Sequence, residues 1–374
     1  MKVPLFRPEL GKEELENIGE VFKSHWIGLG PKVAEFEEKF AEFIGVKYAV
    51  AVNSGTAALH LAVKVLGIGQ RDEVIVPAIT MAASAHAVLY CGAKPVFCDV
   101  DEKTLCLDTN DFKRKITERT KAVIPVHLGG EPCLMDEIMK IARSRGLFVI
   151  EDVANAVGGS YKNKKLGSIG DIGCHSFEAK KNMTTGDGGM LTLNSRKLTE
   201  RLRKLRWYGA SSDTWERLSK GNKKRYSWFY DVEEIGYKYN MNDISAAIGL
   251  AQLKNLPSVI KKKEILRKKY FQALQDIPWL ELPAQNDYAG KASYWLFIAK
   301  LKERDKFIDF MHQNGITTGV HFMPVQFLSV YKKYKTKLPK AERVWRKIVS
   351  LPFFASITDK EFDYVQKTIK RFKN

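Results

Sequence analysis

The sequence contains little cysteine and no long apolar run, and both shortages narrow the kind of protein it can be. Its five cysteines are scattered, odd in number and without CxxC spacing, which argues against a disulfide framework or a zinc site. We therefore predict no bound metal. No uncharged apolar stretch reaches the about 18 residues that a membrane-spanning helix needs, and the N-terminus lacks an apolar signal core. We expect a cytosolic protein with no membrane partner.

Positive charge is in excess, with a formal net charge of +18 at pH 7. Such an excess can attract nucleic acid, a membrane surface or an anionic small substrate. The lysines are spread along the chain, however, and runs such as 261–263 and 332–333 fall on predicted helix surfaces, where charges are usually solvated. No zinc finger or RNA-binding aromatic motif accompanies them. We therefore expect a lysine-rich surface, no nucleic-acid partner, and some attraction for a polyphosphate-bearing substrate.

Short apolar runs that alternate with amphipathic segments predict the fold. The chain has 374 residues, of which 45% are hydrophobic, enough for one large or two ordinary domains. Apolar side chains at helical spacing predict helices over 32–44, 56–66, 81–91 and 136–145. Near-continuous apolar strands between such helices are typical of an α/β fold with a largely parallel sheet covered on both faces. The predicted strands are 48–52, 73–77, 95–100, 122–126 and 147–150.

The pattern changes in the second half of the chain. Residues 211–230 are polar and rich in aromatic side chains, which predicts a long loop near the site. Residues 242–256 predict a long helix, and residues 253–274 extend the link to a second, smaller α/β unit. We predict a large domain over residues 1–250 and a small C-terminal domain over residues 251–374.

A lysine beside a glycine-rich turn is the strongest chemical signal. Lys181 stands at the end of a short apolar strand and precedes a Thr-Thr-Gly-Asp-Gly-Gly turn, a setting that a solvated surface charge explains poorly. An amine held there can form an imine with pyridoxal 5′-phosphate. On chemistry alone Lys180 is as good a candidate, because neighbours on a strand merely face opposite ways. Ser176 lies on the same segment and can add a hydroxyl to the cofactor phosphate.

Pyridoxal phosphate also needs a cradle for its phosphate and an acidic partner for its ring nitrogen. The tripeptide Ser54-Gly55-Thr56 follows the first predicted strand, where a helix N-terminus offers free amides to an anion. The alternative is a simple N-cap with a tight turn. Asp152 ends an apolar strand, where a buried carboxylate is costly unless it is paired, so it can face a protonated pyridine nitrogen. A helix N-cap explains Asp152 equally well.

Taken together and in order, these segments resemble the DegT-type (DegT/StrS) nucleotide-sugar aminotransferases. The resemblance extends from near Pro4 to the end of the chain. It implies an aspartate aminotransferase-like pyridoxal phosphate enzyme of fold type I, a homodimer with two sites at the subunit interface. The segments that carry it are 30–37, 53–59, 92–97, 149–152, 176–189 and 236–241.

The resemblance also assigns roles. It places the imine on Lys181 rather than Lys180, sets Asp152 at the pyridine nitrogen, and gathers the phosphate cradle from Gly55, Thr56 and Ser176. Lys181, once released by L-glutamate, then moves a proton between the substrate carbon and the cofactor as general base and acid.

Several implied site residues depart from the family pattern. Lys238 reaches the phosphate of the partner subunit's cofactor, where many relatives carry Asn. Met81 covers the ring where an aromatic residue is common, and Asn155 replaces the usual Gln or His near the ring. Glu178 stands where many members have His, so a direct substrate contact there differs. His321 matches a position in the second domain that can approach the sugar.

The resemblance implies transfer of an amino group from L-glutamate to a nucleotide-linked keto-6-deoxyhexose. The Thr184-Thr185-Gly186 turn resembles enzymes that act at C4, so we predict C4 amination of the perosamine-synthase kind, with C3 amination as the alternative. The nucleotide, whether GDP, dTDP or UDP, is left open. Relatives that carry His in place of the imine lysine are sugar dehydratases, and Lys181 argues against that reaction. A lone histidine is more often structural than a ligand contact, so a structural role is the alternative for His321 and, more strongly, for His127.

A different class of function stays open beside these enzymes. A basic regulatory or nucleic-acid-binding protein could use the same scaffold without catalysis, and the net charge of +18 is its only support. The joint presence of Lys181, Asp152 and Ser176 favours the enzyme.

Overall fold

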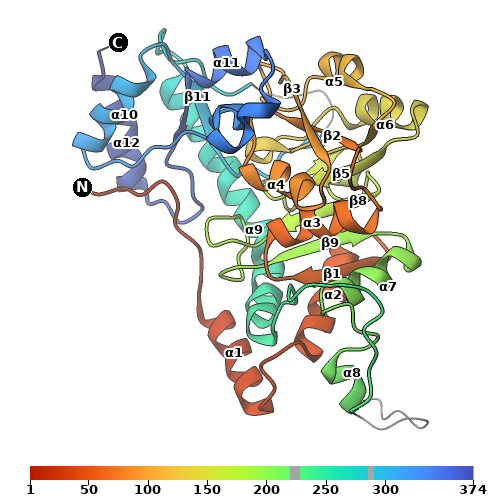
Figure 1. Ribbon diagram of the computed structural model, residues 1–374. Coiled ribbons are helices and arrows are strands. Elements are labelled where there is room, and N and C mark those ends of the chain that lie inside the picture. The colour runs from red at the N-terminus through yellow and green to blue at the C-terminus, as the bar shows by residue number, and fades with distance from the viewer. Residues whose placement is uncertain (220–227, 285–289, 374) are drawn as a thin grey trace.

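A seven-stranded sheet lies at the centre of the computed structural model, which describes residues 1–219, 228–284 and 290–373 (Figure 1). Its strands follow the order β1-β9-β8-β5-β4-β2-β3. From β8 to β3 all neighbours are parallel, whereas β9 runs against both of its neighbours, β1 and β8. The predicted α/β fold with a mostly parallel central sheet is confirmed.

The strands of this sheet form at the short apolar runs, with small shifts at their ends. The sequence-based prediction omits β9, which follows the glycine-rich turn and returns beside β8. The seven strands are β1 (Tyr48–Val52), β2 (Glu73–Pro77), β3 (Lys94–Cys98), β4 (Thr120–Val123), β5 (Phe148–Asp152), β8 (Ile172–Ser176) and β9 (Gly189–Leu193).

The predicted helices in this part of the chain are present. Ordinary end signals set their limits: Pro31 occupies the first turn of α2, and Gly45 ends it in the left-handed region with φ 81°. The helices of this half are α1 (Lys12–Ser24), α2 (Pro31–Ile44), α3 (Gly55–Val65), α4 (Ala82–Tyr90), α5 (Thr109–Lys115), the 3₁₀ turn η1 (Leu128–Gly130), α6 (Met135–Ser144) and α7 (Arg196–Leu205).

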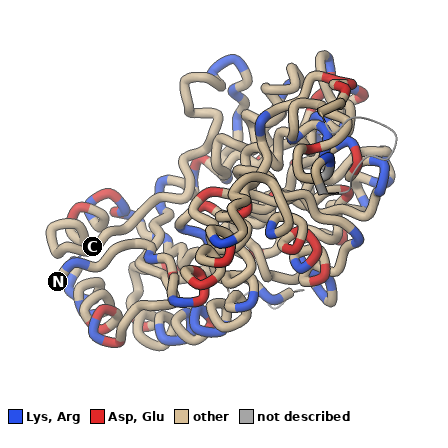
Figure 2. The backbone as a smooth tube through the Cα atoms, turned by 90° about the horizontal axis from the view of Figure 1, so that it is seen from below, with Lys and Arg blue, Asp and Glu red and all other residues tan. Residues whose placement is uncertain are grey.

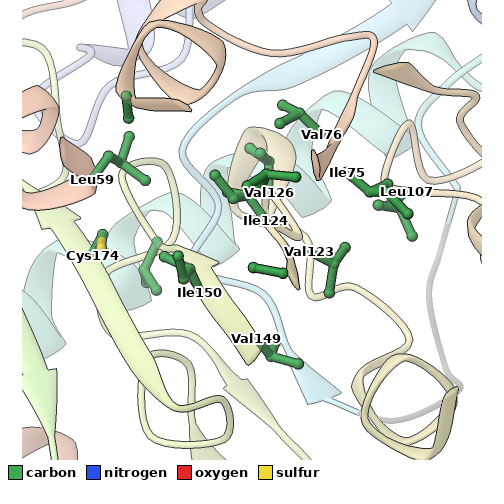
Figure 3. Close-up of a cluster of buried hydrophobic side chains, with 14 of the residues drawn as sticks. Leu59, Ile75, Val76, Leu107, Val123, Ile124, Val126, Val149, Ile150 and Cys174 are labelled. Carbon is green, nitrogen blue, oxygen red and sulfur yellow. The ribbon is translucent and has the colours of Figure 1, made fainter. Parts of the chain in front are cut away.

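Both faces of the sheet are covered by helices. Alternation along β1 shows this directly, because Val50 and Val52 belong to the main core with α3, while Ala49 and Ala51 belong to a core built on α2 and the long helix α9. Figure 3 shows part of the main core, where apolar side chains of the central strands meet Leu59 of α3. Burial on both faces explains why these strands read as continuous apolar runs.

The long helix α9 (Asp243–Leu274) corrects the prediction of a helix that ends near residue 256. It continues without a break through Pro257 and joins the sheet to a second core. The predicted domain boundary at residue 250 falls inside α9, and it stays a prediction. The elements that follow are β11 (Phe297–Lys300), α10 (Arg304–Gln313), η2 (Val325–Phe327), η3 (Ser329–Tyr334), α11 (Pro339–Trp345), β12 (Ile348–Leu351) and α12 (Asp359–Arg371).

The N-terminal segment lies beside this second core before it enters α1 (Figure 1). Val3 pairs with Ile316 and packs with the apolar side chains of α10, α12 and the β11–β12 ladder. The residues that follow it, Leu5 and Phe6, therefore lie between the two cores.

The stretch 211–230, predicted as a long loop near the site, contains a short helix, α8 (Thr214–Ser219), so the loop prediction is wrong there. Residues 220–227 of that stretch lie outside the described residues. A small three-stranded sheet completes the fold and consists of β6 (Ser160–Tyr161), β7 (Lys164–Lys165) and β10 (Gly290–Lys291).

Figure 2 shows lysine and arginine distributed over the chain and interspersed with acidic residues. The basic residues are therefore spread along the chain rather than gathered in one segment, as predicted. Within the described ranges, no helix combines the length and the apolar character that crossing a membrane requires.

Candidate active site

A cavity of about 650 Å³ opens at the carboxyl ends of β1, β5 and β8. In parallel sheets this edge is where ligands bind. The structure brings all the predicted site residues together here except Lys238. Those that line the cavity are Ser54, Gly55, Thr56, Met81, Asp152, Asn155, Ser176, Glu178, Lys181 and His321.

Lys181 lies in the turn after β8, five positions beyond its last residue, rather than on the strand itself. Its Nζ donates a 2.9 Å hydrogen bond to Asn155 Oδ1 and lies 3.8 Å from the centre of the Trp295 ring. Burial lowers the pKa of this amine to about 8, against the attraction of Asp152. A group that is partly neutral near physiological pH is a better nucleophile and base than an ordinary lysine.

Lys180 takes a different position. Its side chain is 63% exposed at the rim of the cavity, and its amine lies 3.9 Å from Glu178. Its backbone carbonyl accepts a 2.8 Å hydrogen bond from the indole nitrogen of Trp295. Because only Lys181 is held against a buried acceptor, the geometry favours it over Lys180 as the reactive amine.

Asp152 is buried at the end of β5. Ser84 of α4 donates a 2.8 Å hydrogen bond to its Oδ2, and the amide of Ala154 donates to its Oδ1. Burial raises the pKa of the carboxyl, although both hydrogen bonds and the amine of Lys181 oppose this effect. A turn rather than a helix follows β5, so the alternative of a helix N-cap is wrong.

The cradle predicted at residues 54–56 forms the first turn of α3. Ser54 is the N-cap, and its hydroxyl accepts a hydrogen bond from the amide of Ala57, so the N-cap interpretation is confirmed. The amides of Gly55 and Thr56 belong to the turn that has no acceptor within the helix. A Cβ atom on Gly55 would lie only 2.8 Å from Cβ of Ser176, so the start of α3 lies directly against the end of β8. This arrangement leaves a helix N-terminus and hydroxyls for an anion.

The remaining cavity residues lie around this centre. Met81 begins α4 and is 59% exposed. His321 lies 2.8 Å from Ser350 through Nδ1 and Oγ, and burial, together with the charge of Lys181, lowers its pKa to about 4. A histidine with that pKa is neutral at pH 7, so it can meet a substrate only as a neutral hydrogen-bonding group.

Two further candidates lie elsewhere. Lys238 is not among the residues lining the cavity of its own chain, and its Nζ stands 3.3 Å from the centre of the Trp207 ring. His127 is completely buried beside Glu151, with Nε2 3.2 Å from Oε2, and its Nδ1 accepts the amide of Cys133. These contacts make His127 structural.

Sequence reasoning missed residues that come from distant parts of the chain. Trp295, which precedes β11, packs under the amine of Lys181 and stacks on Phe6 with ring centres 5.8 Å apart. Ser84 holds Asp152. No local motif surrounds these residues, and only an alignment of many relatives could have marked them.

The polar groups of the cavity match the three polar parts of pyridoxal phosphate. An amine with a lowered pKa faces the same space as a buried carboxylate, and a helix N-terminus with hydroxyls lies at its edge. These groups suit an aldehyde, a pyridinium nitrogen and a phosphate, respectively. The fold and the site together define the class of pyridoxal phosphate enzymes with a lysine at the centre.

Comparison with known proteins identifies the family within that class. Residues 8–370 match the model of the DegT/DnrJ/EryC1/StrS aminotransferase family. The chain belongs to this family and is a sugar aminotransferase that uses pyridoxal phosphate, as the resemblance of its sequence motifs implied.

Individual relatives match over nearly their whole length. Spore coat polysaccharide biosynthesis protein SpsC of Bacillus subtilis is 41% identical over 98% of this chain and 96% of its own. A dTDP-4-dehydro-2,3,6-trideoxy-D-glucose 4-aminotransferase of Saccharopolyspora spinosa is 38% identical over 98% and 97%. The structure of Spr1654 from Streptococcus pneumoniae in its pyridoxal phosphate form is 29% identical, covers 99% and 98%, and superposes with a TM-score of 0.90.

The lowered pKa of Lys181 predicts a pH dependence in the cofactor-free protein. A lysine with a pKa of about 8 carries a neutral amine in about one molecule in ten at pH 7, far more often than an ordinary lysine. Acetylation of Lys181, followed by peptide mass spectrometry, should therefore rise as pH passes through about 8. Other lysine peptides of the same digest serve as the reference, and a Lys181 curve that rises only with theirs would contradict the prediction.

Proposed function

We propose that the protein transfers an amino group from L-glutamate to C4 of a nucleotide-linked 4-keto-6-deoxyhexose. The observation that carries this proposal is the amine of Lys181, held against Asn155 in a cavity that it shares with the buried carboxylate of Asp152. When bound, the cofactor would supply an electron sink and an aldehyde function that carries the amino group between the two substrates.

Each cavity residue then has a part in binding or proton transfer. Nζ of Lys181 would hold the cofactor between turnovers and, once free, would move a proton between the substrate carbon and the cofactor as general base and acid. Asp152 keeps the ring nitrogen protonated. The remaining groups bind and orient the cofactor: Ser54, Gly55, Thr56 and Ser176 at the phosphate, and Met81 and Asn155 beside the ring.

We choose a 4-keto sugar because of the similarity to a named relative, and not because of the Thr184-Thr185-Gly186 turn that first suggested C4. Thr184 and Thr185 are buried, and their hydroxyls donate to the carbonyls of Phe177 and Asp187, so they serve the turn itself. The S. spinosa relative, whose name specifies 4-amination, supports C4. Glu178 and His321 lie on the cavity wall where a sugar would be oriented.

We further propose the homodimer that the resemblance implies. Lys238 stays outside the cavity of its own chain, which is compatible with a role in a partner's site. Met81 lies at the cavity with more than half of its surface exposed, and Tyr208 and Ile235 near Lys238 are also exposed apolar residues. A second copy would cover such surfaces.

A substrate panel tests the proposal. Purified protein with pyridoxal phosphate and L-glutamate should aminate a 4-keto-6-deoxyhexose linked to GDP, dTDP or UDP, and mass spectrometry with NMR of the product identifies the carbon. Amination of 3-keto sugars alone would replace C4 by C3. No amination of any member would reject nucleotide sugars as the substrate class.

A further inference from the structure

Lys263 of α9 is a buried amine with no part in the site described above. Its side chain is 4% exposed, and its Nζ lies 5.5 Å from the centre of the Phe353 ring. Both oxygens that accept its hydrogen bonds are uncharged: Oδ1 of Asn182 at 2.7 Å and the carbonyl of Trp295 at 3.4 Å. Burial lowers its pKa to about 7, and neither of these two acceptors is the carboxylate that usually accompanies a buried amine.

The two acceptors belong to the segments that hold Lys181. Asn182 is the next residue after Lys181, and the ring of Trp295 packs against the amine of Lys181. The side-chain Nδ2 of Asn182 also donates a 2.6 Å hydrogen bond to the carbonyl of Ser293, which ties the turn after β8 to the segment before β11. Lys263 therefore joins these two segments at one point.

Ser293 also links this network to Asn155, which accepts the hydrogen bond from the amine of Lys181. The hydroxyl of Ser293 donates a 3.3 Å hydrogen bond to the carbonyl of Asn155, whose side-chain oxygen accepts from Lys181. The indole nitrogen of Trp295 holds the carbonyl of Lys180. Three hydrogen bonds, from Lys263 to Asn182, from Asn182 to Ser293 and from Ser293 to Asn155, thus connect Lys263 to the acceptor of the Lys181 amine.

A small cavity lies between this turn and α9. A cavity of about 20 Å³ is lined by Lys181, Asn182, Gln252 and Lys263, and it is roughly large enough for one water molecule. The hydrogen bond from Lys263 to Asn182 therefore adds to the burial of Met183, which shares a core cluster with Leu253 of α9.

We propose that Lys263 is a positioning residue that holds the amine of Lys181 in its productive direction through Asn182 and Trp295. This inference rests on the proposed role of Lys181. A misplacement of the reacting amine by about 1 Å is expected to lower the rate of reaction by up to about a hundredfold.

The test uses Lys263→Met, which keeps the length and apolar stem of the side chain, and Asn182→Ala, which removes the acceptor of the same hydrogen bond. In the holoenzyme each should lower kcat for L-glutamate about tenfold to a hundredfold with little change in KM. Visible circular dichroism per bound cofactor should also weaken, because the cofactor is held less rigidly. Lys261→Met, on the exposed face of the same helix, is the matched control and should keep both values.

The double variant decides whether the two residues act together. If Lys263 acts through Asn182, the double variant should lose no more activity than the worse single variant, since coupled residues are not additive. Additive losses, or native kcat and dichroism in a folded Lys263→Met variant, would overturn the inference. If that variant does not fold, Asn182→Ala decides alone. If the Lys263 and Asn182 variants keep native activity while Lys181→Ala is inactive, the inference on Lys263 fails but the proposed function stands.

Discussion

Replacing Lys181 by alanine should abolish both turnover and the visible absorption of the cofactor bound through that lysine. The amine is proposed to hold the cofactor and to move the substrate proton, so one change removes two roles. We expect kcat to fall by more than about ten-thousandfold, the upper range for loss of a general base that is also the covalent anchor. Absorption spectra of the purified variant after addition of pyridoxal phosphate, with amino-group transfer measured in parallel, provide the measurement.

Lys180→Ala is the matched control for this experiment. Lys180 has the same charge one residue earlier, but its side chain is exposed at the rim, 3.9 Å from Glu178. The Lys180→Ala protein should keep the visible absorption band. If that band is lost in Lys180→Ala but kept in Lys181→Ala, the covalent anchor is Lys180 instead. Full activity of Lys181→Ala would reject the assigned chemistry.

Local sequence was sufficient to predict most strands of the sheet, though not β9, and the polar residues at the ends of those strands. Strands such as β1 and β5 are buried on both faces, so their apolar runs were unambiguous, and Ser54 and Asp152 were recognisable as polar residues at strand ends. The motif order then favoured Lys181 over Lys180. Those inferences used residues that are close together in the chain.

Local sequence was insufficient for the contacts that tune these groups. Ser84 meets Asp152, Trp295 meets Lys181 and Lys263 meets Asn182 only because the chain folds, and each is more than sixty positions away from its partner. The residue type can also mislead. Lys263 is the last residue of a Lys-Lys-Lys run, which predicts a solvated helix surface, but Lys263 is buried. Apolar periodicity does not show which lysine of such a run faces inward when its neighbours have the same charge.

Asp152→Asn should be the second most damaging substitution. Asparagine has the same shape, and it can still accept from the amide of Ala154 and meet the hydroxyl of Ser84, so the fold and cofactor binding should persist. It cannot keep the ring nitrogen protonated, because its charge is lost. We expect the single-turnover rate with L-glutamate to fall by about a hundredfold to a thousandfold, as for the loss of one preorganised electrostatic group.

Ser84→Ala separates the charge of Asp152 from its position. That variant removes the 2.8 Å hydrogen bond but leaves the carboxylate, whose pKa burial already raises. The hydrogen bond from Ser84 opposes that rise, so its removal should raise the pKa of Asp152 further and move any acid limb of the rate profile to higher pH. At neutral pH the loss should be much smaller than in Asp152→Asn. Equal losses in both variants would mean that orientation, rather than charge at the ring nitrogen, is what Asp152 contributes.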